Sequence, residues 1–264
     1  LATAKGDGEM DRGLRDRFLV LWRAYFGEAE LPLTFYYTDA GGRGETPRPG
    51  SGHECVLASL AKARHGRPLQ LDVESVGCWG GKRYLGFSQA ISPTFEHFLS
   101  CGIPGQLEGE RYKRSPELVR EYVRHAPAFR APARTIVFKR WDILEEDDPP
   151  EVVIFFARPD VLSGLFTLAN FDEASLHAVV APFGAGCGSI VAYPAVERQT
   201  ERPRAILGMF DVSARPYVPA DTLSFAVPIE KFSRMIAGAP ESFLTTPSWD
   251  AVRQRLHGSG GGAS

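Results

Sequence analysis

The 264-residue sequence has no long hydrophobic run, no excess of either charge and no secretory signal at its start. None of its apolar stretches approaches the roughly 20 residues that a membrane span needs, and residues 1–10 lack the basic and apolar regions of a signal peptide. Lysine and arginine (30) nearly balance aspartate and glutamate (32), which leaves no basic face for nucleic acid. We therefore expect a soluble, cytoplasmic protein that binds neither membranes nor nucleic acid.

Several catalytic and binding motifs are also absent. The sequence contains neither G-x-x-x-x-G-K-[ST] nor G-x-G-x-x-G, the phosphate-binding motifs, and no G-x-S-x-G of a serine hydrolase. It has four cysteines but no C-x-x-C, which argues against a zinc ribbon or a thioredoxin-like site. The composition, 44% hydrophobic and 23% charged, is that of an ordinary globular protein of one or two domains.

The four cysteines are Cys55, Cys78, Cys101 and Cys187, and each is expected beside a helix end or in a glycine-rich turn. In a reducing compartment, free thiols or metal ligands are more common than disulfides. Thiolates favour iron–sulfur clusters, zinc or Cu(I). We predict that the four cysteines bind a [4Fe–4S] cluster, with one iron left open if Cys101 does not bind.

Cys78 and Cys187 lie in two similar segments, GCWGGK and GAGCGS. Glycine lets a backbone amide approach a thiolate or a cluster sulfur closely. The predicted cofactor-binding residues are Gly77, Gly80, Gly81, Lys82, Gly186 and Gly188. Lys82 and Arg83 would also suit a nucleotide or another anionic cofactor. The alternative is a small-molecule or cofactor-binding module whose cysteines only pack in the core, since free cysteine is often buried.

Cys55 is expected in the first turn of a helix over residues 52–65. Ser51 and Glu54 have the spacing of a capping box before the apolar run that follows. The helix amides and dipole would lower the pKa of the thiol and favour the thiolate. His53 precedes Cys55 by two residues, so a Cys–His nucleophile and a zinc site are further alternatives. The sequence leaves open whether the protein is an enzyme.

The order of elements predicts an α/β fold, or a mixed α+β fold, made of two similar halves with mixed sheets and a cleft between them. The N-terminal half, 1–130, contains Cys55, Cys78 and Cys101; the C-terminal half, 131–257, contains Cys187; residues 258–264 form a flexible tail. Each half has a strand, a helix, a Gly–Cys turn and a proline-led helix in the same order. The rival interpretation is that any α/β chain repeats such features. A true repeat would bring Cys78 and Cys187 toward one cleft.

Expected strands cover 33–38, 69–73, 134–141, 152–156, 177–181, 204–211 and 222–227. Expected helices cover 11–26, 52–65, 93–101, 116–125, 161–169, 228–236 and a segment that begins at residue 247. The run at 152–156 is uninterrupted and apolar, as in a central strand covered on both faces. Glycine-rich turns are expected at 77–81 and 184–188.

A family resemblance extends from about residue 14 to residue 256. It rests on the segments HECVLASLAKARHG, GCWGGKRYLGF, RPDVLSGLFTLANFD, APFGAGCGSI, ILGMFDVSARPYVP and ESFLTTPSWDAVRQRL. The sequence resembles the domain-of-unknown-function family numbered one hundred and sixty-nine, whose pattern includes the positions of Cys55, Cys78 and Cys187. The resemblance implies a prokaryotic, cytoplasmic protein with one α/β unit, and it defines no reaction. The expected partner is a small-molecule substrate or a redox partner.

Overall fold

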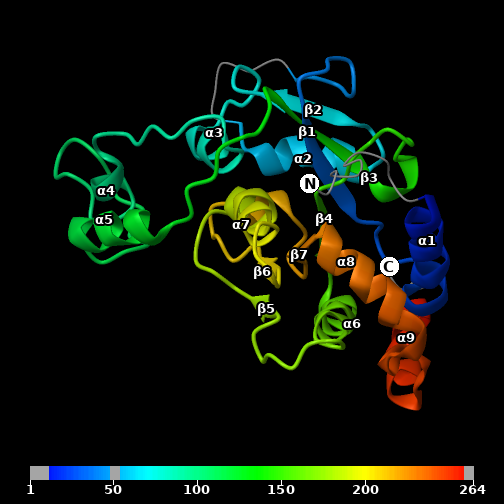
Figure 1. The fold of residues 1–264 in the computed structure, drawn as a ribbon. Coiled ribbons are helices and arrows are strands. Elements are labelled where there is room, and N and C mark those ends of the chain that lie inside the picture. Colours follow the sequence, from blue (N-terminus) through cyan, green and yellow to red (C-terminus); the bar gives the residue numbers. More distant parts are fainter. Residues whose placement is uncertain (1–11, 48–53, 259–264) are drawn as a thin grey trace, which may run out of the picture.

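The centre of the fold is a single mixed β-sheet. A computed structural model describes residues 12–47 and 54–258 (Figure 1). The strands occur in the order β2-β3-β1-β4-β7-β6-β5. Their neighbours are antiparallel except for the parallel pair β5 and β6. The predicted mixed sheet is therefore confirmed, and the fold is the mixed α+β form that the sequence allowed beside α/β. The strands are β1 (Leu33–Thr38), β2 (Leu69–Asp72), β3 (Thr135–Arg140), β4 (Val152–Ala157), β5 (Val179–Val180), β6 (Ala205–Gly208) and β7 (Leu223–Pro228).

Helices connect these strands. The α-helices are α1 (Arg12–Phe26), α2 (Val56–Arg64), α3 (Trp79–Tyr84), α4 (Phe95–Phe98), α5 (Pro116–His125), α6 (Pro159–Ala169), α7 (Tyr193–Glu197), α8 (Ile229–Gly238) and α9 (Pro247–Gly258). Shorter helical segments are η1 (Trp141–Ile143), η2 (Gly188–Ala192), η3 (Arg215–Tyr217), η4 (Ala239–Glu241) and η5 (Phe243–Thr245). Within the described residues, no helix combines the length and the hydrophobicity needed to cross a bilayer.

The sheet separates two hydrophobic cores. Alternate residues of β4 point to opposite faces, so Val152, Ile154 and Phe156 belong to one core, and Val153, Phe155 and Ala157 belong to the other. The first core also contains α2, η2 and α7, whereas the second contains α1, α6, α8 and Trp249 of α9. The prediction that residues 152–156 form a central strand covered on both faces is confirmed.

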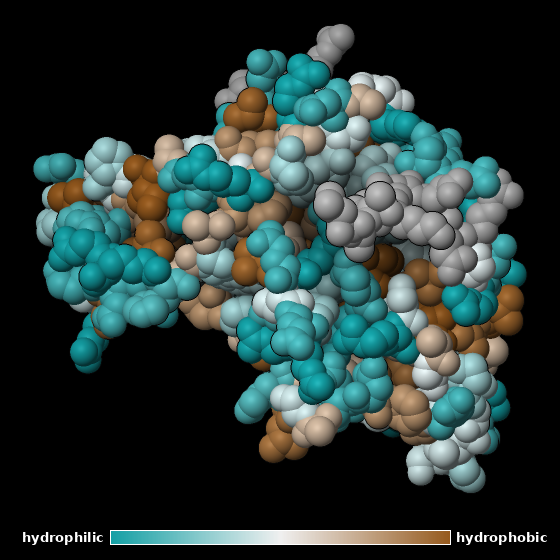
Figure 2. Space-filling view, viewed as in Figure 1, coloured by the Kyte–Doolittle hydropathy of each residue, from teal (hydrophilic) through white to brown (hydrophobic). Residues whose placement is uncertain are grey.

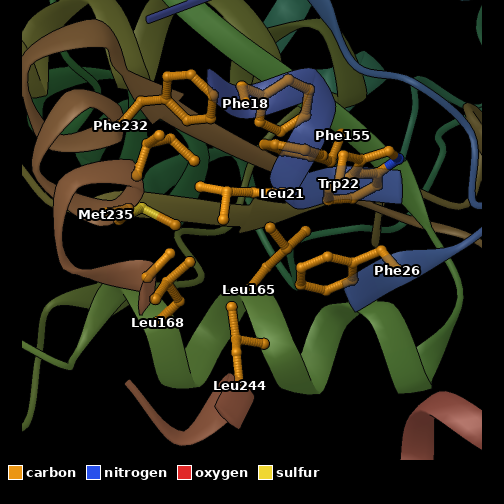
Figure 3. Close-up of a pocket in the computed structure, with 12 residues that line it drawn as sticks. Phe18, Leu21, Trp22, Phe26, Phe155, Leu165, Leu168, Phe232, Met235 and Leu244 are labelled. Atoms are coloured by element: carbon orange, nitrogen blue, oxygen red, sulfur yellow. The ribbon is translucent and has the colours of Figure 1, made fainter. Parts of the chain in front are cut away.

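The second core has no room for a ligand. Figure 3 shows side chains of α1, α6 and α8, among them Phe18, Trp22, Leu165 and Phe232, directed toward a common space. That space is a cavity of about 20 Å³ lined by apolar side chains. A cavity of this size is large enough for a water molecule, but it offers too few polar partners to hold one. The functional site must therefore be sought elsewhere.

The two predicted halves contribute to one sheet rather than to two. β3 pairs with both β1 and β2, so a boundary at residue 130 would separate β3 from its partners. The order β2-β3-β1 on one side corresponds to β6-β7-β4 on the other, as a repeat would require. However, the helices that follow the first strand of each half, α2 and α6, lie in different cores. The internal repeat therefore stays a prediction.

Residues 88–131, called the lobe below, extend away from the sheet between α3 and β3 (Figure 1). The lobe contains α4 and α5, and its two ends are joined by a hydrogen bond from Nε2 of Gln89 to the carbonyl oxygen of Phe129. α5 begins as predicted, with Ser115 as N-cap and Pro116 in the first turn. α4 is shorter than predicted and begins after Thr94.

Candidate functional site

Three of the four cysteines lie at the start of a helix. Cys55 and Cys78 are the extended N-caps of α2 and α3, whereas Cys187 has helical backbone angles and lies in the first turn of the helical segment that continues into η2. The sulfur of Cys78 accepts a hydrogen bond from the amide of Gly81 at 3.3 Å. Cys55 was expected inside the first turn, but α2 begins only at Val56. Ser51 and His53, on which the capping box and the Cys–His pair depend, lie outside the described residues.

The three cysteine-bearing segments contact one another in pairs, and a glycine lies at each contact. A β-carbon added to Gly81 of α3 would lie 2.6 Å from Cγ2 of Val56 in α2. One added to Gly186 would lie 3.0 Å from Cδ1 of Leu57 in α2. One added to Gly188 would lie 2.8 Å from Cδ1 of Tyr84 in α3. The contacts at Gly81 and Gly188 are shorter than real side chains tolerate, and the contact at Gly186 would require Leu57 to shift, so glycine lets these segments approach closely.

Cys55, Cys78 and Cys187 are close enough for their charges to interact. Burial raises the pKa of the Cys187 thiol well above its usual value, and negative charge on Cys78, Cys55 and Asp211 raises it further. Burial likewise raises the pKa of Cys55, although the amides of Leu57 and Ala58 partly oppose this effect. The prediction of a lowered pKa at Cys55 is therefore wrong, because the loss of solvent outweighs the helix amides.

Asp211, between β6 and β7, completes the charged surroundings of the three thiols. One carboxylate oxygen accepts a hydrogen bond from the amide of Gly186 at 3.0 Å. The other accepts from the amide and the hydroxyl of Ser213, at 3.0 and 2.8 Å. These bonds hold the segment after β6 against the turn that carries Cys187. No motif in the sequence marks Asp211, because the fold alone brings it to the cysteines.

Three tyrosines, Tyr84, Tyr122 and Tyr193, pack together near Cys187. The hydroxyl groups of Tyr84 and Tyr122 lie 3.2 Å apart, and Tyr193 donates a hydrogen bond to the carbonyl oxygen of Phe183 at 3.1 Å. Burial raises the pKa of both Tyr84 and Tyr193, and negative charge on Tyr122 and on Cys187 adds to the effect. Tyr84 and Tyr193 are therefore neutral, the hydroxyl hydrogen of Tyr193 is used by Phe183, and one hydroxyl of the Tyr84–Tyr122 pair keeps a hydrogen to donate to another group. Their separation in the sequence explains why they were not predicted.

Cys101 lies apart from the other three cysteines. It follows α4 in the lobe and is exposed, and its sulfur faces its own neighbours, donating to the carbonyl oxygen of Gly102 at 3.6 Å. Cys101 is not among the main charged groups that act on Cys55 or Cys187. The structure thus brings together three of the predicted metal ligands and leaves the fourth in another part of the molecule.

The predicted cofactor-binding glycines have a packing role. Gly80, Gly81 and Lys82 belong to α3 rather than to a turn, and Gly77, before the helix, is exposed. Gly186 and Gly188 are buried. None of these five glycines has a positive φ, so the reason for glycine here is close approach. Gly80 is an exception with open space around it, since the sulfur of Cys78, at 3.9 Å, is the nearest atom to an added β-carbon.

The spacing of the donor atoms limits which metal the cysteines can hold. Within the described chain, only Glu145, Asp147 and Asp148 place three possible ligand atoms within 4.8 Å of one another. Those carboxylates already pair with Arg43 and Lys139. The three sulfurs are more widely spaced than this, whereas a tetrahedral zinc ion with bonds of about 2.3 Å draws its ligands closer together. A multi-iron cluster separates its ligands further, because each thiolate binds a different iron.

The fold and the site define a mixed α+β protein in which three cysteine-bearing segments pack against one another on one face of a mixed sheet. A family model, DUF169, described as uncharacterised ArCR, matches residues 30–238. Because the match covers more than half of the chain, the protein belongs to this family, as the sequence resemblance indicated. Neither a curated protein nor a solved structure matches the chain.

Proposed function

We propose that Cys55, Cys78 and Cys187 together hold one [4Fe–4S] cluster whose fourth iron is open to a small substrate. The main support for this proposal is that three cysteine-bearing segments, distant in sequence, contact one another in pairs at Gly81, Gly186 and Gly188. Each segment presents its cysteine at the start of a helix. Packing alone does not require cysteine at all three positions, whereas cluster binding does.

The surroundings of the thiols suit a cationic centre. The main charged groups acting on Cys55 and Cys187 are other thiols and Asp211, all of which are negative when ionised. Without a cation, the buried thiols keep their protons; iron would displace those protons and neutralise the thiolates. The amide of Gly81, which donates to the sulfur of Cys78, represents the kind of hydrogen bond that tunes cluster potentials.

A cluster with three cysteine ligands leaves one iron without a protein thiolate. Cys101 is the remaining cysteine, and its position in the lobe keeps it from the other three. When bound, the cluster would supply either one-electron transfer or Lewis-acid chemistry at its open iron. Asp211, whose charge acts on Cys55 and Cys187, would then lie near a substrate bound at that iron. This assignment presupposes the reducing, cytoplasmic setting predicted from the sequence.

A second candidate is a small-molecule binding module whose cysteines are structural. Cys187 is only 8% exposed, and burial raises its pKa, so in the metal-free protein it is a neutral, apolar side chain. Such a thiol can serve packing alone. The two candidates make opposite predictions about iron binding.

Anaerobic reconstitution with iron and sulfide distinguishes the cluster protein from the binding module. The reconstituted protein should show the broad visible charge-transfer absorbance of a thiolate-bound cluster. Serine at Cys55, Cys78 or Cys187 should abolish or strongly reduce the absorbance. Cys101→Ser is the matched control, since it makes the same substitution at an exposed cysteine, and it should leave the spectrum unchanged.

Protein that stays colourless and free of iron would refute the cluster and favour the binding module. Loss of the spectrum in Cys101→Ser as well would contradict a cluster held by Cys55, Cys78 and Cys187 alone and would favour Cys101 as a fourth ligand, as the sequence first suggested. Circular dichroism of each variant before reconstitution would show whether the fold is intact.

A further inference from the structure

Lys113 of the lobe has a fixed position but no acidic partner. Its ammonium nitrogen lies 4.1 Å from the ring centre of Phe183 and 5.3 Å from that of Tyr122. These rings attract the cation and restrict where it can lie. Within the described residues, no carboxylate is within ion-pair distance of Lys113. Its N–H donors are therefore available to a ligand.

Other cations of the lobe and of α3 also lack an acidic partner within the described residues. Arg111 and Arg114 flank the same segment, and Lys82 lies in α3; in the described chain, none of the three forms an ion pair. Arg120, by contrast, pairs with Glu96 and Glu117 in the same lobe. The lobe is the projection at the left of Figure 2, and hydrophilic residues cover much of its lower side.

The backbone is strained on both sides of the site. In the described chain, only Arg111 and Met209 among non-glycine residues have a positive φ, 58° and 71°. Arg111 lies two residues before Lys113, and Met209 lies two residues before Asp211. Strain of this kind costs free energy and tends to be kept where function requires it.

We propose that Lys113, held by Phe183 and Tyr122, is the centre of a binding site for a small molecule that carries a phosphate or carboxylate group. An ammonium ion pairs with either group as a point charge. The uncompensated positive charge of Arg111, Arg114 and Lys82 attracts the same class of ligand.

A short series of contacts joins this site to the cysteines. Lys113 lies over Tyr122, Tyr122 contacts the hydroxyl of Tyr84, and Tyr84 packs against Gly188, next to Cys187. Lys113 also lies over Phe183, whose carbonyl oxygen accepts the bond from Tyr193. The inference rests on the proposed function in one respect, because it identifies the anion as the substrate of the three-cysteine centre.

Calorimetric titration of the metal-free, full-length protein tests the site without depending on a cluster. The probes are inorganic phosphate and succinate, which distinguish a phosphate from a carboxylate ligand. We expect at least one to bind, more weakly at higher salt because the contact is ionic. Lys113→Gln should weaken binding about tenfold or more. Phe183→Leu should also weaken it, because the ammonium loses one of the rings that position it.

Arg124→Gln is the matched control. It removes one positive charge from the same lobe, but Arg124 lies two residues after Tyr122 on α5 and therefore on a different side of that helix. It should leave binding within about twofold of the parent. Parent protein that binds neither probe below about 10 mM, or equal losses in Lys113→Gln and Arg124→Gln, would overturn the proposal. Neither result would change the iron content of reconstituted protein, so the cluster is tested separately.

Discussion

Gly81 of α3 lies so close to Val56 of α2 that a β-carbon at Gly81 would be 2.6 Å from Cγ2 of Val56. Val56 follows Cys55 directly, and Gly81 donates its amide hydrogen to the sulfur of Cys78. This one contact therefore sets the distance between two of the three thiols. Substitution of the glycine offers a way to change that distance without touching a cysteine.

We expect Gly81→Ala to destabilise the protein by about 1–3 kcal/mol, because the methyl group overpacks the contact between α2 and α3. The free energy of unfolding from a urea titration measures the effect. Gly80→Ala is the control, since open space surrounds that position; alanine there should stabilise the helix by up to about 1 kcal/mol. Equal effects at the two positions would contradict the close contact.

Thiol alkylation should follow burial and pKa. The thiolate is the reactive form, so exposed Cys101 should react with iodoacetamide before Cys55, whose pKa is raised by burial. Cys187 is buried and its pKa is raised furthest, so it should react only when the protein unfolds. Peptide mass spectrometry of a time course gives the order. Rapid labelling of Cys187 in the native protein would contradict the structure.

Alkaline pH should destabilise the metal-free protein. The thiols of Cys55 and Cys187 have raised pKa values in the folded chain, against about 8.5 in an unfolded one. Below that pH both thiols are neutral in the folded and the unfolded chain, so the stability they contribute by staying neutral is fully present. Above it, the unfolded chain ionises first and the free energy of unfolding falls. Melting temperatures between about pH 7.5 and pH 9.5 should fall less in Cys187→Ala than in the parent. An identical pH dependence would contradict the raised pKa of Cys187.

Lys139 and Asp148 form a buried ion pair, at 2.8 Å, that should be important for stability. Their side chains are only 4% and 0% exposed. Lys139→Met would leave the carboxylate of Asp148 without its buried cation, which typically costs about 3–5 kcal/mol. Arg134→Met breaks the exposed pair with Asp39 and should have a much smaller effect, because solvent screens that pair. Similar urea midpoints for the two variants would show that the buried pair is not needed.

Elements with strong local signals were predicted well. The apolar run at 152–156 became β4, and the Ser115–Pro116 start signal produced α5. α3 was predicted as a turn, because two glycines in six residues disfavour a helix. Packing against α2 and η2 overrides that local preference. Local rules therefore failed where segments distant in sequence meet.

The candidate site was predicted in part for the same reason. The glycines beside Cys78 and Cys187 mark close contacts, and such contacts can be read from a local pattern. Asp211, Tyr193 and Lys113 reach the site from separate segments, so no spacing in the sequence connects them. The position of Cys101 depends on the direction in which the lobe extends from the sheet (Figure 1), which residue types alone do not specify.

The most direct test of the account is the iron and acid-labile sulfide content of two variants reconstituted side by side under anaerobic conditions. The account predicts about four iron atoms and four sulfides per chain in Cys101→Ser, and close to none in Cys78→Ser. Iron-free Cys101→Ser protein with an intact fold, or equal iron in both variants, would contradict the claim that Cys55, Cys78 and Cys187 hold the cluster.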